Sequence, residues 1–113
     1  MATLGRVSEE HVVVLTTTDS EDVAAELASG LVAAGLAACV QIGGPVRSLY
    51  RWEGEVKDER EWQLWIKTTY ERLPEVNRHI EREHPYEVPE VLALPVLAGS
   101  EAYLDWVSEQ TAR

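Results

Sequence analysis

The chain has 113 residues, of which 45% are hydrophobic and 27% are charged, a composition typical of one stably folded globular domain. Its 20 Asp and Glu outnumber its 10 Lys and Arg and give a formal net charge of −10, so we expect neither nucleic acid nor an anionic membrane surface as a partner. The single cysteine excludes an internal disulfide, and a chain of this length can bury a core without a structural metal, so folding requires no cofactor.

The first ten residues show no hydrophobic pattern, and we expect residues 1–10 to form a flexible tail before a single domain over residues 11–113. They also lack the apolar run of a signal peptide, and no stretch of the chain has the roughly 20 apolar residues that span a membrane. These features predict a cytoplasmic protein without a membrane anchor.

The first predicted strand is the β-branched run at residues 12–17, which is typical of a central strand buried on both faces. Hydrophobic residues at helical spacing then predict a helix over residues 19–34. Thr18 and Glu21 have the spacing of a capping box at its start, and Gly35 suits a left-handed helix end.

A long hairpin follows the first helix. Residues 36–52 predict one extended strand that is bent or bulged at the Gly-Gly-Pro of residues 43–45. Alternating hydrophobicity resumes over residues 56–68, so we expect the hairpin to turn near Gly54. Both arms are longer than the usual five or six residues of a strand.

A second helix is predicted between Pro74, near its start, and Pro85, before which it should end. Residues 91–96 predict a short strand, and Ser100 is a good cap for a last helix. The order β-α-β-β-α-β plus a terminal helix predicts an α+β fold, the ferredoxin-like antiparallel sandwich. We expect both main helices on one sheet face and the first and last strands in the centre.

The hairpin carries more apolar surface than two helices can cover. Its large side chains include Tyr50, Trp52, Trp62 and Trp65. Because a long exposed apolar edge promotes association, we expect an obligate homo-oligomer.

The densest polar cluster lies at residues 84–90, where His84, Tyr86, Glu87 and Glu90 are held between two prolines. Imidazole and carboxylate ligands suit zinc, copper or manganese. The alternative is structural: His84 ends the helix, Tyr86 packs on the sheet, and both carboxylates are solvated. The spacing matches no closed zinc site.

Other polar residues favour structural roles. Cys39 lies in an apolar strand, where a free thiol behaves as a small hydrophobic group. His79 and Glu83 are four residues apart on a charged helix and are expected on its solvated face, and His11 is expected at the surface.

We find no nucleophile elbow, phosphate loop or apolar carboxylate pair, so we do not expect an enzyme. Arg47 and Arg51 share one side of the first hairpin arm. They could meet an anion between subunits, or pair across the strands with Glu59 or Glu61.

Four segments of this sequence resemble the CutA proteins, a family named for divalent-cation tolerance. The matching segments are residues 36–40 (Leu-Ala-Ala-Cys-Val), 48–54 (Ser-Leu-Tyr-Arg-Trp-Glu-Gly), 66–69 (Ile-Lys-Thr-Thr) and 84–90 (His-Pro-Tyr-Glu-Val-Pro-Glu). The resemblance extends from about Val12 to Trp106. It implies a ferredoxin-like homotrimer whose long hairpins wrap neighbouring subunits, a link to tolerance of copper and other divalent metal ions, and no enzymatic activity.

The resemblance also indicates metal-ligand positions, which here are Thr16, Glu83 and His84. In some family members these positions are a cysteine and a pair of histidines. Of the three residues here, only His84 is the same, and Thr16 in place of the cysteine removes the soft thiolate ligand. With Glu87 or Glu90, this set would accept copper(II) or another divalent cation through nitrogen and oxygen.

Two other interpretations use the same fold. A signalling trimer resembling the PII proteins would bind a small anionic metabolite between subunits through Arg47, Arg51, Lys67 and Tyr86, on fold similarity alone. A small acylphosphatase-like hydrolase is disfavoured, because the chain lacks an anion-cradling loop followed by a helix.

Overall fold

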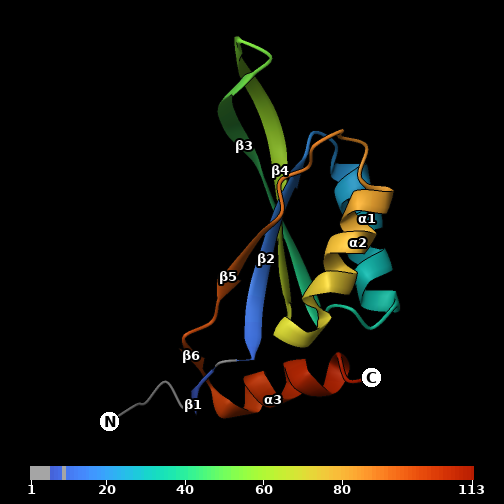
Figure 1. The fold of residues 1–113 in the computed structure, drawn as a ribbon, viewed down its shortest axis with the longest axis vertical. Helices are drawn as coiled ribbons and strands as arrows, with labels where there is room; N and C mark the ends of the chain where they lie inside the picture. The colour runs from blue at the N-terminus through green and yellow to red at the C-terminus, as the bar shows by residue number, and fades with distance from the viewer. Residues whose placement is uncertain (1–5, 9) are drawn as a thin grey trace.

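A computed structural model of the chain describes residues 6–8 and 10–113 (Figure 1). The elements, in chain order, are β1 (Arg6–Val7), β2 (His11–Thr18), α1 (Glu21–Ala33), β3 (Cys39–Trp52), β4 (Glu55–Thr69), the 3₁₀ turn η1 (Tyr70–Arg72), α2 (Leu73–Glu83), β5 (Leu92–Pro95), β6 (Ala98–Gly99) and α3 (Glu101–Gln110). Of the predicted tail, residues 1–5 and 9 lie outside the described residues, and β1 pairs with β6. No helix within the described residues is long and apolar enough to cross a membrane.

The four main strands form one antiparallel sheet in the order β3-β4-β2-β5, which confirms the predicted ferredoxin-like, α+β architecture. The first strand, β2, is central as predicted, but the expectation of a central last strand was wrong. The returning hairpin arm β4 pairs with β2 along its whole length, from His11↔Thr69 to Thr18↔Trp62. The short β5 pairs with β2 through four residues and lies at the sheet edge.

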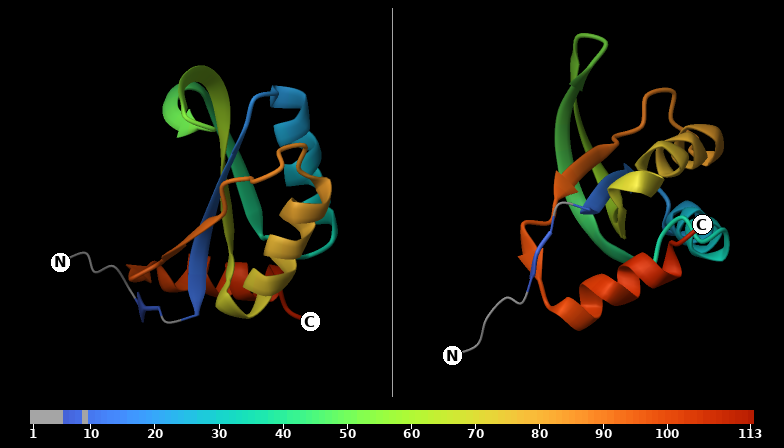
Figure 2. Two further views of the ribbon diagram at one scale, coloured as in Figure 1. Left: turned by 45° about the horizontal axis from the view of Figure 1, so that its top comes forward. Right: turned by 60° about the horizontal axis from the view of Figure 1, so that its bottom comes forward.

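Both main helices cover one face of this sheet, which we call the inner face (Figure 2). Alternation along β2 and β4 sends every second side chain to this face, where it meets the apolar sides of α1 and α2. The largest fully buried apolar side chains of this core are Val14, Leu27, Leu31, Leu64, Ile66, Val76 and Ile80. The opposite, outer face has no such cover from α1 or α2.

Helix α1 starts at a different cap from the predicted one. Ser20 is the N-cap, and its Oγ accepts the backbone N–H of Val23 at 3.3 Å. Thr18 is instead the last residue of β2, with its side chain fully buried, so it is not available to cap the helix. Gly35 has a φ of 70°, which confirms the predicted left-handed end.

Helices α1 and α2 approach each other closely at Gly30 and His79. The prediction that His79 lies on a solvated face was wrong, because its residue is only 8% exposed. A Cβ atom on Gly30 would lie 2.9 Å from both Cε1 and Nε2 of the His79 ring. The missing side chain of Gly30 is therefore what makes room for the imidazole. Desolvation, and then the charge of Arg82, lower the pKa of His79.

His11 was also expected at the surface, but it is 4% exposed and links β2 to α3. Its Nδ1 lies 2.6 Å from Oγ of Ser8, and its Nε2 lies 2.9 Å from the backbone oxygen of Leu104 and 2.9 Å from Oγ of Ser108. By strand alternation His11 belongs to the outer face. Helix α3 thus packs near one end of the sheet (Figure 1), while the remainder of the outer face is left open.

The β3–β4 hairpin projects beyond the helices, in a molecule that measures 48 × 32 × 21 Å (Figure 1). The predicted bulge is confirmed as a register shift between Gly43 and Val46. Gly44 has a φ of 134° there. The predicted turn is also confirmed: Glu53 and Gly54 have φ values of 50° and 78°, the left-handed pair that a two-residue hairpin loop uses.

Candidate functional site

His84, the best candidate ligand by sequence, is turned into the protein and is 7% exposed. Its Nε2 donates to the backbone oxygen of Thr17 at 2.7 Å, and its Nδ1 accepts the backbone N–H of Tyr86 at 3.0 Å. This pairing requires the tautomer with the proton on Nε2. Both ring nitrogens therefore have protein partners, and a metal ion could reach His84 only by displacing one of them.

The other predicted ligands do not gather around His84 in one chain. The side chain of Thr16 is fully buried under the helices, and its Oγ1 has no hydrogen-bond partner among the described residues. Glu83 is exposed and pairs with Arg82 at 3.1 Å, and both Glu87 and Glu90 keep access to solvent. Across residues 6–8 and 10–113, no three His, Cys, Asp or Glu side chains are grouped so that they could hold a metal ion.

The residues of the alternative anion cleft are also separated within one chain. Arg47 is held by Asp58 through two hydrogen bonds of 2.8 and 2.6 Å, and Lys67 donates to Gln41 at 2.6 Å. Lys67 lies opposite Cys39, eight residues before Arg47 on β3, which is roughly 26 Å of extended strand. Arg51 is near the hairpin tip, and Tyr86 is bonded to a carboxylate. One chain alone does not form this cleft.

What one chain does assemble is an acidic, aromatic face on the hairpin. Strand alternation places Tyr50 and Trp52 on the same side of β3, and the β3–β4 register places Glu59 and Glu61 on that side as well, opposite Ser48 and Val46. The Tyr50 hydroxyl donates to Oε1 of Glu59 at 2.9 Å, and this hydrogen bond raises the pKa of Tyr50.

The loop after α2 brings a second set of residues to this face. The hydroxyl of Tyr86 donates to Oε2 of Glu61 at 2.8 Å, and the Tyr86 ring lies 4.6 Å from that of His84, centroid to centroid. Burial, and then the hydrogen bond to Glu61, raise the pKa of Tyr86 well above its usual value. Desolvation, followed by the charge of Glu61, raises the pKa of Glu90.

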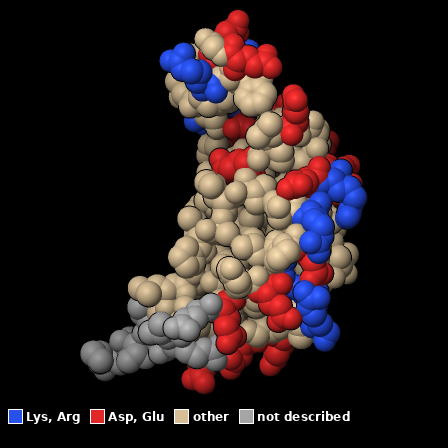
Figure 3. Space-filling model, in the orientation of Figure 1, with Lys and Arg blue, Asp and Glu red and all other residues tan. Residues whose placement is uncertain are grey.

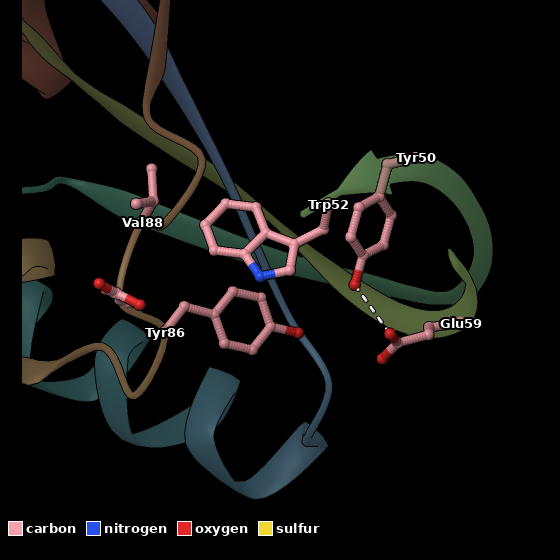
Figure 4. Close-up of a pocket in the computed structure, with 6 residues that line it drawn as sticks. Tyr50, Trp52, Glu59, Tyr86 and Val88 are labelled. Atoms are coloured by element: carbon pink, nitrogen blue, oxygen red, sulfur yellow. Dashed lines mark hydrogen bonds between the residues drawn. The ribbon is translucent and has the colours of Figure 1, made fainter. Parts of the chain in front are cut away.

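The hairpin and the loop enclose a cavity of about 260 Å³, which we call the aromatic pocket. Its lining residues are Tyr50, Trp52, Glu59, Tyr86, Glu87 and Val88. In Figure 4 the indole of Trp52 lies between the rings of Tyr50 and Tyr86, with Val88 beside it. The lining therefore combines three aromatic rings with two carboxylates and contains no basic side chain.

The sequence indicated Tyr86 and Glu87 as candidate site residues, but it did not indicate that Trp52 and Glu59 line the same pocket. The alternation from Val46 to Trp52 does put both hairpin aromatics on one side. Only the register of the second arm, fixed by the bulge after Gly43, shows that glutamates share this side.

Cys39 is half-buried, so the predicted core position is only partly realised. Desolvation, and then the nearby Cys39, raise the pKa of Tyr103. The outer-face end of β3 therefore contacts α3.

Comparison with known proteins gives a consistent result. The family model described as CutA1 divalent ion tolerance protein matches residues 12–110. The divalent-cation tolerance protein CutA of Thermus thermophilus is 46% identical over 99 residues, which cover 88% of this chain and 96% of that protein. The chloroplastic protein CutA of Arabidopsis thaliana is 40% identical over 100 residues, and the chain spans 55% of its length. The structure of CutA from Synechococcus elongatus superposes with a TM-score of 0.90 at 40% identity, covering 95% of each chain.

Proposed function

Because this chain belongs to the CutA1 divalent ion tolerance family, we propose that it works as a homotrimeric binding protein in divalent-cation tolerance, without catalysing a reaction. The observation that carries the proposal is the uncovered outer face of the sheet. It supplies the apolar surface that an obligate assembly buries, and the family relationship supplies the expected number of subunits.

The outer face presents apolar side chains in rows across the strands. Leu92 on β5 lies opposite Leu15 on β2, which lies opposite Trp65 on β4. Leu92 is 54% exposed and Trp65 is 39% exposed. Leu94, 43% exposed, lies opposite Val13 in the next row, which ends on β4 at Lys67. Figure 3 shows a broad surface without Lys, Arg, Asp or Glu over the strands, while charged groups gather at the hairpin tip and beside the helices. Burying such a face favours an oligomer through the hydrophobic effect.

Light scattering after gel filtration, supported by native mass spectrometry, tests the assembly. We expect a particle of three times the 12.6 kDa chain mass at micromolar concentration. Trp65→Glu and Leu94→Glu should each shift the protein toward monomer, because they place a charge in the buried interface.

Val32→Glu is the matched control. Val32 is 47% exposed on α1, so the substitution adds the same charge to an equally exposed apolar site on the helix side. It should leave the mass unchanged. A monodisperse monomer for the unmodified chain, or equal dissociation by all three variants, would contradict the proposal.

For direct binding of a divalent cation, Glu61 and Glu90 are the best candidates in this chain. Both line a second, open cavity of about 570 Å³ that is also lined by Thr17, Ser48 and Arg47. The positive charge of Arg47 is paired with Asp58 through two hydrogen bonds. The charge of Glu61 contributes to the raised pKa of Glu90, so a cation between them would relieve their repulsion. Carboxylates accept copper(II), zinc or manganese, and water or a neighbouring subunit would complete the coordination.

Calorimetric titration with copper(II), zinc(II) and manganese(II) in a non-chelating buffer tests this site. Glu90→Gln should lower the affinity, whereas Glu83→Gln, which makes the same charge change on α2, should not. Equal, salt-sensitive losses from both would mean that the net charge of −10 attracts cations without a site. That result would remove direct metal binding but would leave the trimer proposal intact.

A further inference from the structure

We propose that the aromatic pocket between the β3–β4 hairpin and the loop at residues 84–90 binds a small organic ammonium ion, of the quaternary kind that aromatic cages recognise. All six lining residues belong to one chain, and the proposal requires that the neighbouring subunit leaves the pocket open in the assembled protein. It does not depend on the divalent-cation site proposed above.

The three rings provide the first part of the argument. An ammonium ion is attracted to the negative face of an aromatic ring, and tryptophan is the strongest such partner. Tyr50, Trp52 and Tyr86 line one cavity of about 260 Å³, which suits a methylated ammonium group better than a bare metal ion. Val88 adds an apolar wall against which methyl groups can pack (Figure 4).

The charges provide the second part. Glu59 and Glu87 line the pocket, and Glu61 accepts the hydrogen bond of Tyr86 at its edge. Arg47 and Arg51 occupy alternate positions on the opposite side of β3. Lys57 lies opposite Tyr50 on the pocket side, but it does not line the pocket and is paired with Glu55 at 3.3 Å. Low local polarity combined with negative charge favours a cation that is only weakly hydrated.

The negative charge of Glu61 also acts on the hydroxyl of Tyr86. Burial, the hydrogen bond to Glu61 and the charge of Glu61 all raise the pKa of Tyr86. Of these effects, only the negative charge of Glu61 also favours a positive ion in the same place, because burial disfavours a charge of either sign. For the same reason an anionic metabolite would be repelled from this pocket.

The pocket is less suitable for a divalent metal. One oxygen of Glu59 already accepts the hydroxyl of Tyr50, and the walls are mainly aromatic carbon. Divalent ions bind mainly through oxygen and nitrogen ligands, and here the only charged ligands are the carboxylates of Glu59 and Glu87.

Two probes of the same shape separate charge from size: choline and its uncharged carbon analogue, 3,3-dimethylbutan-1-ol. Binding to the full, assembled chain is measured by saturation-transfer NMR and calorimetry. We expect saturable choline binding and at least about tenfold weaker binding of the alcohol, because only choline gains the cation–aromatic attraction. Equal binding of both probes, or no saturation by choline, would overturn the proposal.

Two tryptophan variants locate the site. Trp52→Leu should weaken choline binding about tenfold, whereas Trp106→Leu on α3 should not change it. The two residues are matched, since Trp52 is 40% exposed and Trp106 is 39% exposed. Equal effects of both variants would place the binding elsewhere and overturn the assignment.

A carboxylate variant tests the same site independently, in case the tryptophan variant does not fold. The double change Glu59→Gln and Glu87→Gln keeps the shape of both side chains and should weaken choline binding while leaving binding of the alcohol unchanged. Unchanged choline affinity in this variant would also contradict the proposal. Circular dichroism and the oligomer mass show that each variant keeps its fold.

Discussion

The hydroxyl of Tyr86 donates a 2.8 Å hydrogen bond to Oε2 of Glu61, and this contact fastens the loop after α2 to strand β4. Glu61 is only 6% exposed, so its carboxylate has little water to replace the lost donor if the hydroxyl is removed.

Tyr86→Phe should therefore lower the free energy of unfolding by about 1.5–3 kcal/mol, the range for hydrogen bonds to charged groups. Urea denaturation at a fixed protein concentration measures the change. Tyr70→Phe is the control, because Tyr70 is 67% exposed, and it should change stability by less than about 0.5 kcal/mol. Equal losses in the two variants would show that the Glu61 contact contributes nothing.

His84→Ala should destabilise the protein by about 2–4 kcal/mol, because it leaves the backbone oxygen of Thr17 and the N–H of Tyr86 without partners. Thermal and urea unfolding of the metal-free protein measure the effect. Glu83→Ala, an exposed change at the preceding residue, should have little effect. A stable His84→Ala variant would mean that the imidazole is retained for a ligand and not for the fold.

Glu90→Gln should raise the melting temperature at pH 7. Desolvation and the charge of Glu61 raise the pKa of Glu90 in the folded protein, so the folded state binds its proton more tightly than the unfolded state. This group therefore costs stability as the pH rises from its unfolded pKa of about 4.3 through the folded value.

The gain from Glu90→Gln should shrink as the pH falls toward about 4.3 and vanish well below it, where the carboxyl is protonated in both states. Scanning calorimetry from acid to neutral pH follows the difference. Glu87→Gln makes the same change in net charge and serves as the control. A gain that did not depend on pH would refute a titration origin.

Gly44→Ala should destabilise the hairpin by about 1–3 kcal/mol, because Gly44 has a φ of 134° and its added Cβ would lie 3.0 Å from the backbone oxygen of Glu61. Gly43→Ala is the matched control, since a Cβ there meets no atom within 4 Å. Denaturant unfolding of the two variants side by side makes the comparison. Similar stabilities would show that the bulge relaxes around the new methyl group.

Much of the fold follows from local sequence signals. Gly-Gly-Pro at residues 43–45 marks the bulge, Gly54 marks the turn, and Ser100 caps the last helix with an Oγ that accepts the N–H of Tyr103 at 3.3 Å. These signals act through the backbone of a few adjacent residues. They need no knowledge of distant partners.

The missed features depend on contacts between distant segments. His11 is buried because Leu104, 93 residues later, offers it a carbonyl, and no local pattern indicates that pairing. Strand β4 is central because it pairs with β2 on one edge and β3 on the other, whereas β5 pairs only with β2.

The candidate site was predicted in its composition but not in its geometry. The sequence shows that His84, Tyr86, Glu87 and Glu90 are neighbours in the chain. It does not show that the His84 ring turns inward to a backbone oxygen or that Tyr86 reaches Glu61, 25 residues away. Both outcomes follow from the need to pair buried polar groups, which depends on the packed structure.

The close approach of Gly30 to His79 links the evolution of the two helices. A methyl group at position 30 would lie 2.9 Å from the imidazole, so a larger residue there requires the His79 ring to move, a smaller residue at position 79 or a wider spacing of the helices. Among homologous sequences these two positions should therefore vary together, and a histidine at the second should be accompanied by glycine at the first. Introducing either residue alone into a homologous protein would therefore leave this pair incomplete.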